Sequence, residues 1–240
     1  MARRAGRRRK AQGHLASAFR AGRTATFLFV GLSLFWVAWH RFAPVNGTVL
    51  MGMRSLQGET VAHAWTPLND VSPEIVRAVI AAEDNKFCDH LGFDLGEMRA
   101  AWREARSGGR VRGASTISQQ TAKNVFLWPG GGYLRKGFEV WFTGAAELFW
   151  PKRRVMEVYL NVAEWGDGYF GIEAAARGRF GKSAKDLTSA EAALLAAVLP
   201  SPNKWRVDPP GPYVASRART LRSRMAQVRR EGRADCVLGD

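Results

Sequence analysis

The stretch SPEIVRAVIAAED, residues 72–84, decides the fold class. Ser72 followed by Pro73 is typical of a helix start. A serine side chain accepts a hydrogen bond from a free backbone amide of the first turn, and proline lacks the amide hydrogen that would be left unpaired there. The segment then ends in two carboxylates, Glu83 and Asp84. It therefore predicts a helix that packs on a core and carries acid groups at its end. Apolar residues at helical spacing form the packing face: Ile75, Val76, Val79 and Ile80.

Other segments show the same kind of pattern. Asp94 and Thr188 each have a glutamate three residues later, which is the spacing of a helix-capping box. No sustained two-residue alternation indicates a large sheet. The fold class is therefore mainly α. Apolar stripes with stop signals predict further helices within 94–107, 134–149, 155–159, 188–199 and 213–230, and small residues lead into another after Gly113.

The composition of the 240-residue chain fits one domain with short extensions. Apolar residues make up 46%, which excludes a disordered chain. The formal net charge is +15, and no Asp or Glu occurs from Met1 to Gly58. The basic run at residues 3–10 suits either nucleic-acid binding or the cytoplasmic flank of a membrane segment.

The uncharged segment ATFLFVGLSLFWVAW, residues 25–39, favours the membrane flank over nucleic-acid binding. With its flanks it approaches the ~20 residues that span a bilayer. A cleaved signal peptide is the alternative, but no small-x-small cleavage site follows the apolar run. We therefore expect a retained anchor with the N-terminus inside. The expected regions are a basic tail 1–23, an anchor 24–45, a connector 46–70 and an extramembrane domain 71–240.

The two cysteines, Cys88 and Cys236, do not make a disulfide framework. They could pair in an oxidising compartment, but we expect two free or partly buried thiols. No metal-ligand cluster stands out among the four histidines and two cysteines, so no metal site is expected. The role of the basic C-terminal helix is left open, with one option that it packs its apolar side on the domain and turns its arginines to lipid.

Three groups of residues could carry chemistry. Burial at a helix end would raise the pKa of Glu83 toward that of a general base, although a solvated acidic pair with Asp84 is the plainer alternative. Polar residues after Gly113 suit a ligand with hydroxyls and a phosphate, or simply a capped surface helix. These residues are Ser115, Gln119, Gln120, Lys123 and Asn124. Finally, Arg135 and Lys136 lie at helical spacing from Glu139, as a surface ion pair or a cationic clamp on pyrophosphate.

Five motifs follow one another over about residues 65–210. They are AAEDNKFCDHLGFD (81–94), GASTISQQTAKN (113–124), RKGFE (135–139), EVYLN with a later GDGYFG (within 157–176) and LTSAEAALLAA (187–197). With these motifs the chain resembles the family 51 glycosyltransferases, the peptidoglycan transglycosylases. The resemblance implies a lysozyme-like, two-lobed helical domain. The chain ends too soon for a second, transpeptidase domain, so a monofunctional enzyme is expected.

The resemblance also implies the substrate and the roles. The substrate would be lipid II, a disaccharide-peptide on undecaprenyl pyrophosphate, which is joined with inversion to a growing glycan strand. Glu83 would be the general base and Glu139 the second functional glutamate. Lys123, Arg135 and Lys136 would neutralise the leaving pyrophosphate. Asp84, Ser115, Gln119, Gln120 and Asn124 would lie in the same cleft and bind the substrate.

The same resemblance sets the surroundings. The enzyme would sit in the bacterial inner membrane with its catalytic domain on the periplasmic side, against membrane lipids. Cell-wall synthesis or division proteins are candidate partners, and nucleic acid is not. No cofactor is expected, with a divalent cation left open as an aid. A lysozyme-like lytic hydrolase is the alternative function. One departure stands out, because Gly131 occupies a position where many relatives carry arginine.

Overall fold

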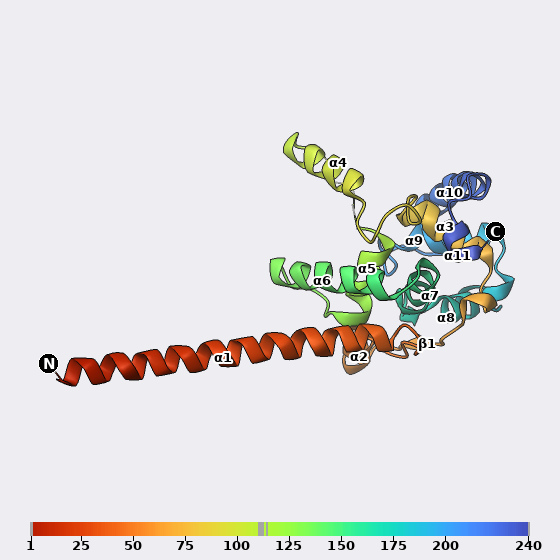
Figure 1. Ribbon diagram of the computed structural model, residues 1–240. Coiled ribbons are helices and arrows are strands. Elements are labelled where there is room, and N and C mark those ends of the chain that lie inside the picture. The colour runs from red at the N-terminus through yellow and green to blue at the C-terminus, as the bar shows by residue number, and fades with distance from the viewer. Residues whose placement is uncertain (1, 110–112, 114, 240) are drawn as a thin grey trace.

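The structure is a computed structural model that describes residues 2–109, 113 and 115–239, with side chains from residue 17 onward. Within these residues the chain forms eleven α-helices, and its only sheet there is a parallel pair of two-residue strands (Figure 1). The strands are β1 (Ala62–His63) and β2 (Tyr169–Phe170). The prediction of a mainly α protein is confirmed. The basic run at residues 3–10 lies outside the described side chains.

The helices of the extramembrane domain form two groups around one continuous core. Helices α3 (Pro73–Glu83), α9 (Ser189–Val198) and α10 (Pro212–Arg230) pack on one another. Helix α5 (Ile117–Phe126) packs between α6 (Tyr133–Phe149) and α7 (Lys152–Val162). This grouping agrees with the expected two lobes. The remaining helices are α2 (Val49–Leu56), α4 (Leu95–Arg106), α8 (Ile172–Phe180), α11 (Asp235–Leu238), and the 3-10 turns η1 (Leu68–Asp70) and η2 (Ala184–Asp186).

Helix α3 forms as the sequence predicts. Ser72 Oγ accepts a hydrogen bond from the Glu74 amide at 3.3 Å, and Pro73 occupies the first turn. The apolar stripe is fully buried, and each such side chain contributes about 1.5–3 kcal/mol. Asp84 leaves the helical conformation at a φ of −160°. The helix therefore ends with the Glu83 side chain at its tip.

Capping interactions fix the starts of three other helices. Both Thr116 and Thr188 begin full capping boxes, at α5 and α9 respectively. Asp94 Oδ1 accepts from the Glu97 amide at 2.9 Å and starts α4. Helix α4 buries none of its side chains, and Trp102 remains 59% exposed. The prediction of a helix there is confirmed, but its apolar face is not buried.

The N-terminal helix α1 (Ala2–Trp39) contains an apolar span, Ser17–Trp39, that is long enough to cross a membrane. This span ends before residue 45, because the chain turns after Trp39. The end of α1 packs on α6. There Trp150 Nε1 donates to the Val37 carbonyl at 2.8 Å, and Trp141 Nε1 donates to Ser33 Oγ at 3.1 Å. The helix is compatible with a single-pass anchor docked on its domain.

The connector at residues 46–70 belongs to the folded domain. Asn161 of α7 accepts from the Thr66 amide at 2.8 Å and donates to the Thr66 carbonyl at 2.9 Å. Glu157 accepts from the Leu68 amide at 2.9 Å. Because β1 also pairs with β2, the chain enters the domain well before residue 71. The polar residues of the EVYLN motif thus fasten the connector.

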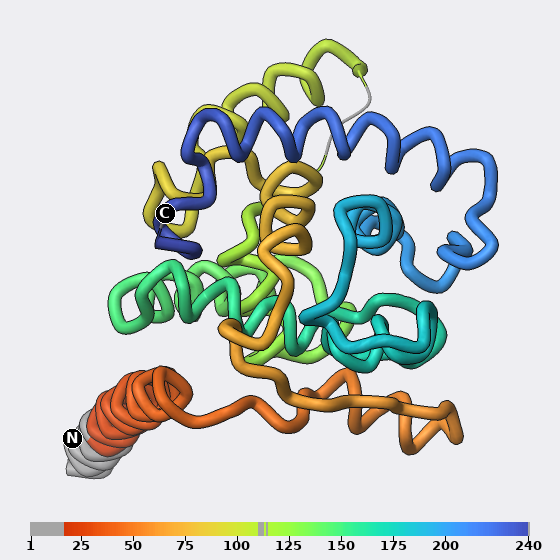
Figure 2. Tube along the Cα trace, turned by 90° about the vertical axis from the view of Figure 1, so that its right-hand side faces the viewer, coloured from red at the N-terminus to blue at the C-terminus, as the bar shows by residue number. Residues whose placement is uncertain are grey.

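One expectation at the C-terminal end is wrong. Cys88 and Cys236 form a disulfide, with their Cα atoms 5.7 Å apart, although 148 positions separate them. Folding brings these two residues together through contacts that are distant in sequence. Helix α10 and helix α1 lie on opposite sides of the domain in both views (Figures 1 and 2). This arrangement does not favour contact of the α10 arginines with lipid.

The disulfide generates a prediction about stability. Replacement of Cys236 by serine should lower the free energy of unfolding by about 2–4 kcal/mol, because the unfolded chain gains the entropy of a long open loop. Urea unfolding of the detergent-solubilised protein measures this change. The Cys88→Ser variant and the double variant should match it. Two free thiols in the denatured, unreduced wild-type protein would contradict the prediction.

Candidate active site

Glu83 lies at the tip of α3 and faces α5. Gln120 Nε2 donates a hydrogen bond to Glu83 Oε2 at 2.8 Å. Burial raises the pKa of the Glu83 carboxyl above its ordinary value, while the bond from Gln120 and the charge of Arg217 offset part of that rise. A partly buried carboxylate with a raised pKa suits proton abstraction. The solvated acidic pair, our plainer alternative, does not fit this environment.

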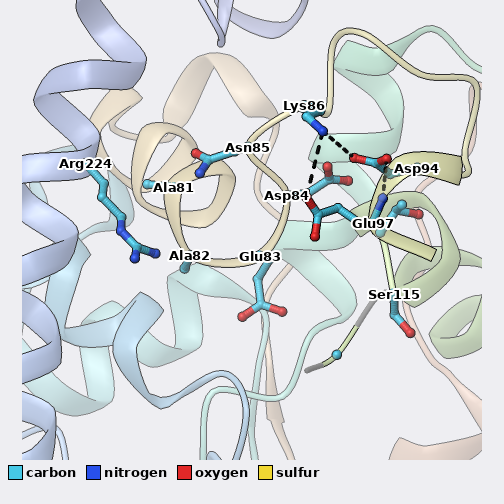
Figure 3. Close-up of a pocket in the computed structure, with 12 residues that line it drawn as sticks. Ala81, Ala82, Glu83, Asp84, Asn85, Lys86, Asp94, Glu97, Ser115 and Arg224 are labelled. Atoms are coloured by element: carbon cyan, nitrogen blue, oxygen red, sulfur yellow. Dashed lines mark hydrogen bonds and ion pairs between the residues drawn. The ribbon is translucent and has the colours of Figure 1, made fainter. Parts of the chain in front are cut away.

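The Glu83 carboxylate opens into a pocket of about 300 Å³. Figure 3 shows the carboxylate between the Arg224 guanidinium on one side and Ser115 on the other. The pocket walls come from the end of α3, the start of α4, the segment before α5, and α10. Ser115 is exposed there, as a substrate-binding residue requires. The full lining is Ala81, Ala82, Glu83, Asp84, Asn85, Lys86, Asp94, Glu97, Gly113, Ser115, Thr116 and Arg224.

Asp84 has a different position from its neighbour. Its carboxylate is buried, accepts a hydrogen bond from the Ile117 amide at 3.0 Å, and contacts His90 Nε2 at 3.0 Å. It therefore holds the first turn of α5 against the end of α3. Asp84 therefore positions the two helix ends, and only part of the residue lines the pocket.

The two glutamines of α5 have separate tasks. Gln119 is buried, and its Oε1 accepts from the Thr116 amide at 3.0 Å within the capping box. Gln120, on the next helical position, reaches Glu83 instead. Tyr159, which is buried in α7, donates from its hydroxyl to Gln120 Oε1 at 3.5 Å. This contact orients the amide so that its nitrogen points at Glu83.

A second pocket of about 400 Å³ lies farther along α5. Lys123 and Asn124 reach it from α5, and Arg135 reaches it from α6. Burial lowers the pKa of Lys123, while the charge of Glu139 favours its protonated form. Leu50 of α2 also lines this pocket, which places it on the anchor side of the domain. The full lining is Leu50, Lys123, Asn124, Leu127, Trp128, Pro129, Gly130, Gly131 and Arg135.

Glu139 is buried although its partners are charged. Arg135 Nη1 lies 2.9 Å from Glu139 Oε2, and Lys136 Nζ bonds the other carboxylate oxygen. Since the carboxylate is shielded from water, the ion pairs hold the two cations in fixed places more firmly than an exposed pair would. Arg135 and Lys136 are thus two fixed cations held by a buried carboxylate, and together we call them the cationic wall.

Gly131 needs to be a glycine in this fold. Its φ is +79°, a conformation that side chains strain. A Cβ there would lie 3.0 Å from Trp128 Nε1 and 3.1 Å from Arg135 Cβ. An arginine at this position would therefore strain the loop as it is folded here.

The sequence interpretation missed Arg217 and Arg224 of α10. Arg224 lines the Glu83 pocket, and the charge of Arg217 acts on the Glu83 carboxyl. The two arginines lie seven positions apart, so they share one helix face. That spacing was visible in the sequence, but the neighbour of that face was not. Among the described residues no group of three or more His, Cys, Asp or Glu side chains gathers as a metal site.

The geometry thus joins a carboxylate base to an adjoining pocket of fixed cations. Such a pair suits transfer from a donor whose leaving group is a phosphate ester or pyrophosphate. Nine of the ten expected site residues line one of the two pockets or bond a residue that does: Glu83, Asp84, Ser115, Gln119, Gln120, Lys123, Asn124, Arg135 and Glu139. Gln119 does so by bonding Thr116 in the capping box of α5, whereas Lys136 reaches the site only through Glu139.

Comparisons with known proteins agree with this geometry. A family model described as Transglycosylase matches residues 49–228. A biosynthetic peptidoglycan transglycosylase of Caulobacter vibrioides is 53% identical over 198 residues, which cover 82% of this chain and 86% of that protein. Proteins with the same description from Rhodospirillum centenum and Pseudomonas fluorescens are 53% and 48% identical, over 88% and 85% of this chain and 93% and 88% of their own lengths.

The Gln120 contact generates a prediction about proton affinity. Replacement of Gln120 by alanine should raise the pKa of Glu83 further, because the hydrogen bond that favours the charged carboxylate is lost. A carbon-13 NMR titration of the glutamate carboxyl measures this pKa. Asn124→Ala, one turn along α5, is the matched control and should leave it unchanged. An unaltered or lower pKa in the Gln120 variant would count against the geometry described.

Proposed function

The chain belongs to the transglycosylase family, and from that premise we propose how its two pockets polymerise lipid II. It is a peptidoglycan glycosyltransferase that makes glycan for the cell wall. The substrate class follows from the pockets: one offers a base for a sugar hydroxyl, and the other offers cations for a pyrophosphate. The observation that carries the proposal is that a single helix, α5, serves both.

Glu83 is the general base in this proposal. It takes the proton from the 4-hydroxyl of the acceptor sugar, and the oxygen attacks C1 of the donor sugar from the face opposite the leaving group. The bond from C1 to the pyrophosphate oxygen breaks, so configuration inverts and undecaprenyl pyrophosphate leaves. The raised pKa of Glu83 supports the role, because a carboxylate that is a stronger base accepts the hydroxyl proton more readily.

Helix α5 sets the distance between base and leaving group. Gln120 contacts Glu83, and Lys123 follows three residues later on the same face. Three residues of helix rise about 4.5 Å, a span that fits between the two ends of a reacting sugar. Lys123 then faces the cationic wall of α6, since the charges of Glu139, Arg135 and Lys136 all act on it. The leaving pyrophosphate is neutralised there.

Glu139 acts through the cations rather than on the sugar. Its buried carboxylate bonds Arg135 and Lys136, so these side chains need no reorganisation when the pyrophosphate charge develops. Preorganised charge is usually the largest single contribution to such catalysis. Glu139 is therefore a positioning residue for the second pocket, the one around Lys123, which we call the donor pocket.

A lytic hydrolase of the same glycan is the weaker alternative. It would also use two carboxylates, and their presence alone does not discriminate. A glycan strand, however, carries no pyrophosphate at the bond that a hydrolase cuts. The cationic pocket around Lys123 would then have no task, while transfer from a lipid pyrophosphate uses every charge in it.

The membrane arrangement follows from the docking of α1. We place the domain on the periplasmic face of the inner membrane with the N-terminus inside, in agreement with the acid-free, basic N-terminal region. Tyr133 and Leu134 at the start of α6 are 98% and 73% exposed and lie beside the donor pocket. Apolar side chains there suit contact with lipid. Lipid II would enter from the bilayer, and cell-wall synthesis or division proteins stay candidate partners.

The proposed reaction needs no resident cofactor. Lysine and arginine side chains supply the positive charge that a metal ion supplies in other phosphate sites. Polymerisation should therefore persist when EDTA removes free divalent cations. A complete loss in EDTA that magnesium restores would show that a cation assists at the pyrophosphate.

The role of Glu83 is tested by polymerisation of purified lipid II in detergent. Replacement of Glu83 by glutamine should lower the rate at least 100-fold, because general-base catalysis is worth about 10²–10⁴-fold. Glutamine keeps the shape and can still accept from Gln120. Glu74→Gln, at the other end of α3, is the matched control and should polymerise normally. Equal rates for the Glu83 variant and wild type would move the base elsewhere.

The donor pocket has its own test. Replacement of Lys123 by methionine should lower kcat about 10²–10³-fold, since a preorganised donor to the developing charge is lost. Lys123→Arg should retain part of the rate because it keeps the charge. Lys185→Met, an exposed lysine outside both pockets, is the control. A Lys123→Met enzyme with normal kcat would place the pyrophosphate in another site.

A further inference from the structure

Helix α10 carries a polar groove to which the proposed reaction assigns no substrate contact. Tyr213, Arg217, Thr220 and Arg224 follow one another at spacings of four, three and four, which places them on one face. They line a pocket of about 240 Å³. Arg224 also lines the Glu83 pocket, and Figure 3 shows its guanidinium on the Glu83 side of α10. The two pockets therefore share Arg224 as a common wall.

The arginines of this groove form no direct ion pair in the part of the chain that the structure describes, whereas Arg229 of the same helix pairs with Glu74. Arg217 lies near enough to Glu83 for its charge to act on that carboxyl. Arg217 Nε is buried and has no hydrogen-bond partner among the described residues. Arg224 is exposed, so its guanidinium can bind a ligand that brings oxygen acceptors.

The position of the groove limits which anion can reach it. Helix α10 lies on the side of the domain opposite α1 and the lipid-facing start of α6 (Figures 1 and 2). Lipid headgroups stay at the membrane, and a pyrophosphate attached to the lipid stays near it. The peptide of the substrate hangs from the sugar instead and ends in carboxylates. Those carboxylates can extend away from the membrane, past Glu83, toward α10.

We propose that the α10 groove binds the carboxylates of the substrate's stem peptide, with Arg224 as the principal contact and Arg217 behind it. The proposal rests on the function given above and adds a specificity site to it. Arginine suits this task because its planar group binds a carboxylate through two parallel hydrogen bonds. The enzyme would then sense the peptide of each unit while Glu83 and Lys123 act on its sugar.

The test uses binding, so that it does not depend on catalysis. The probe is a fluorescent disaccharide-pentapeptide without lipid or pyrophosphate, added to the full-length protein in detergent. Arg224→Gln should weaken its binding about three- to tenfold, as expected for one charged contact of about 1 kcal/mol. Arg230→Gln, an exposed arginine on another face of α10, is the matched control and should bind like wild type. Circular dichroism checks that both variants fold.

A second probe closes a thermodynamic cycle. The same disaccharide-peptide with its carboxylates amidated should bind wild type about three- to tenfold more weakly, and Arg224→Gln should weaken it no further. Equal weakening of both probes by the variant would overturn the proposal and give Arg224 a structural role. Displacement of the probe by inorganic pyrophosphate, with no effect of amidation, would also overturn it and make the groove a phosphate site.

The two proposals fail in different ways. If wild type does not polymerise lipid II, the proposed function fails, whereas the binding cycle still decides whether the groove recognises carboxylates. If wild type polymerises lipid II, Arg224→Gln should raise KM about three- to tenfold for intact lipid II, and lipid II lacking its peptide should show no such change. The same change in KM for lipid II lacking its peptide would overturn the inference and spare the polymerase.

Discussion

The buried carboxylate of Asp84 is the interaction on which the site depends. It joins the end of α3 to the first turn of α5 through the Ile117 amide, and His90 contacts it on the other side. A buried charge without such partners would cost several kcal/mol, so the two helix ends cannot separate cheaply. Gln120 follows Ile117 by three residues, and its distance from Glu83 is fixed by the same junction. The position of Lys123 on α5 follows in turn.

The junction holds the Glu83 carboxylate where burial disfavours its charged form, and this makes it a stronger base. Burial raises its pKa above the ordinary 4.5, so between 4.5 and the folded-state pKa the folded protein binds more protons than the unfolded chain. Stability therefore falls as pH rises through that window and stays reduced above it. Gln120 and Arg217 limit the loss because both favour the charged form. The raised pKa that makes Glu83 a better base therefore lowers the free energy of unfolding above that pKa. Gln120 and Arg217 favour the deprotonated form, which is the form that acts as a base.

Sequence patterns predicted what depends on neighbouring residues and missed what depends on distant ones. The capping boxes and the apolar stripe of α3 are local, and the structure contains them. Gln119 could also have been interpreted locally, because Thr116 and Gln119 have capping-box spacing. The Cys88–Cys236 disulfide joins residues 148 positions apart, and no local signal brings them together. Periodicity likewise placed Arg217 and Arg224 on one face but could not show that Glu83 lies opposite.

The two pockets give the domain a direction relative to the membrane. Arg154 of α7 donates to the carbonyls of His40 and Ala43, so the chain leaving α1 is fixed to the domain instead of swinging on a linker. Leu50, only a few residues later, lines the donor pocket. The cations thus sit near the end of α1, while Arg224 of α10 lines the Glu83 pocket. Under the proposed function, a lipid-linked sugar held by its pyrophosphate at the first would present its glycan and peptide to the second, and α1 would then help to orient the substrate.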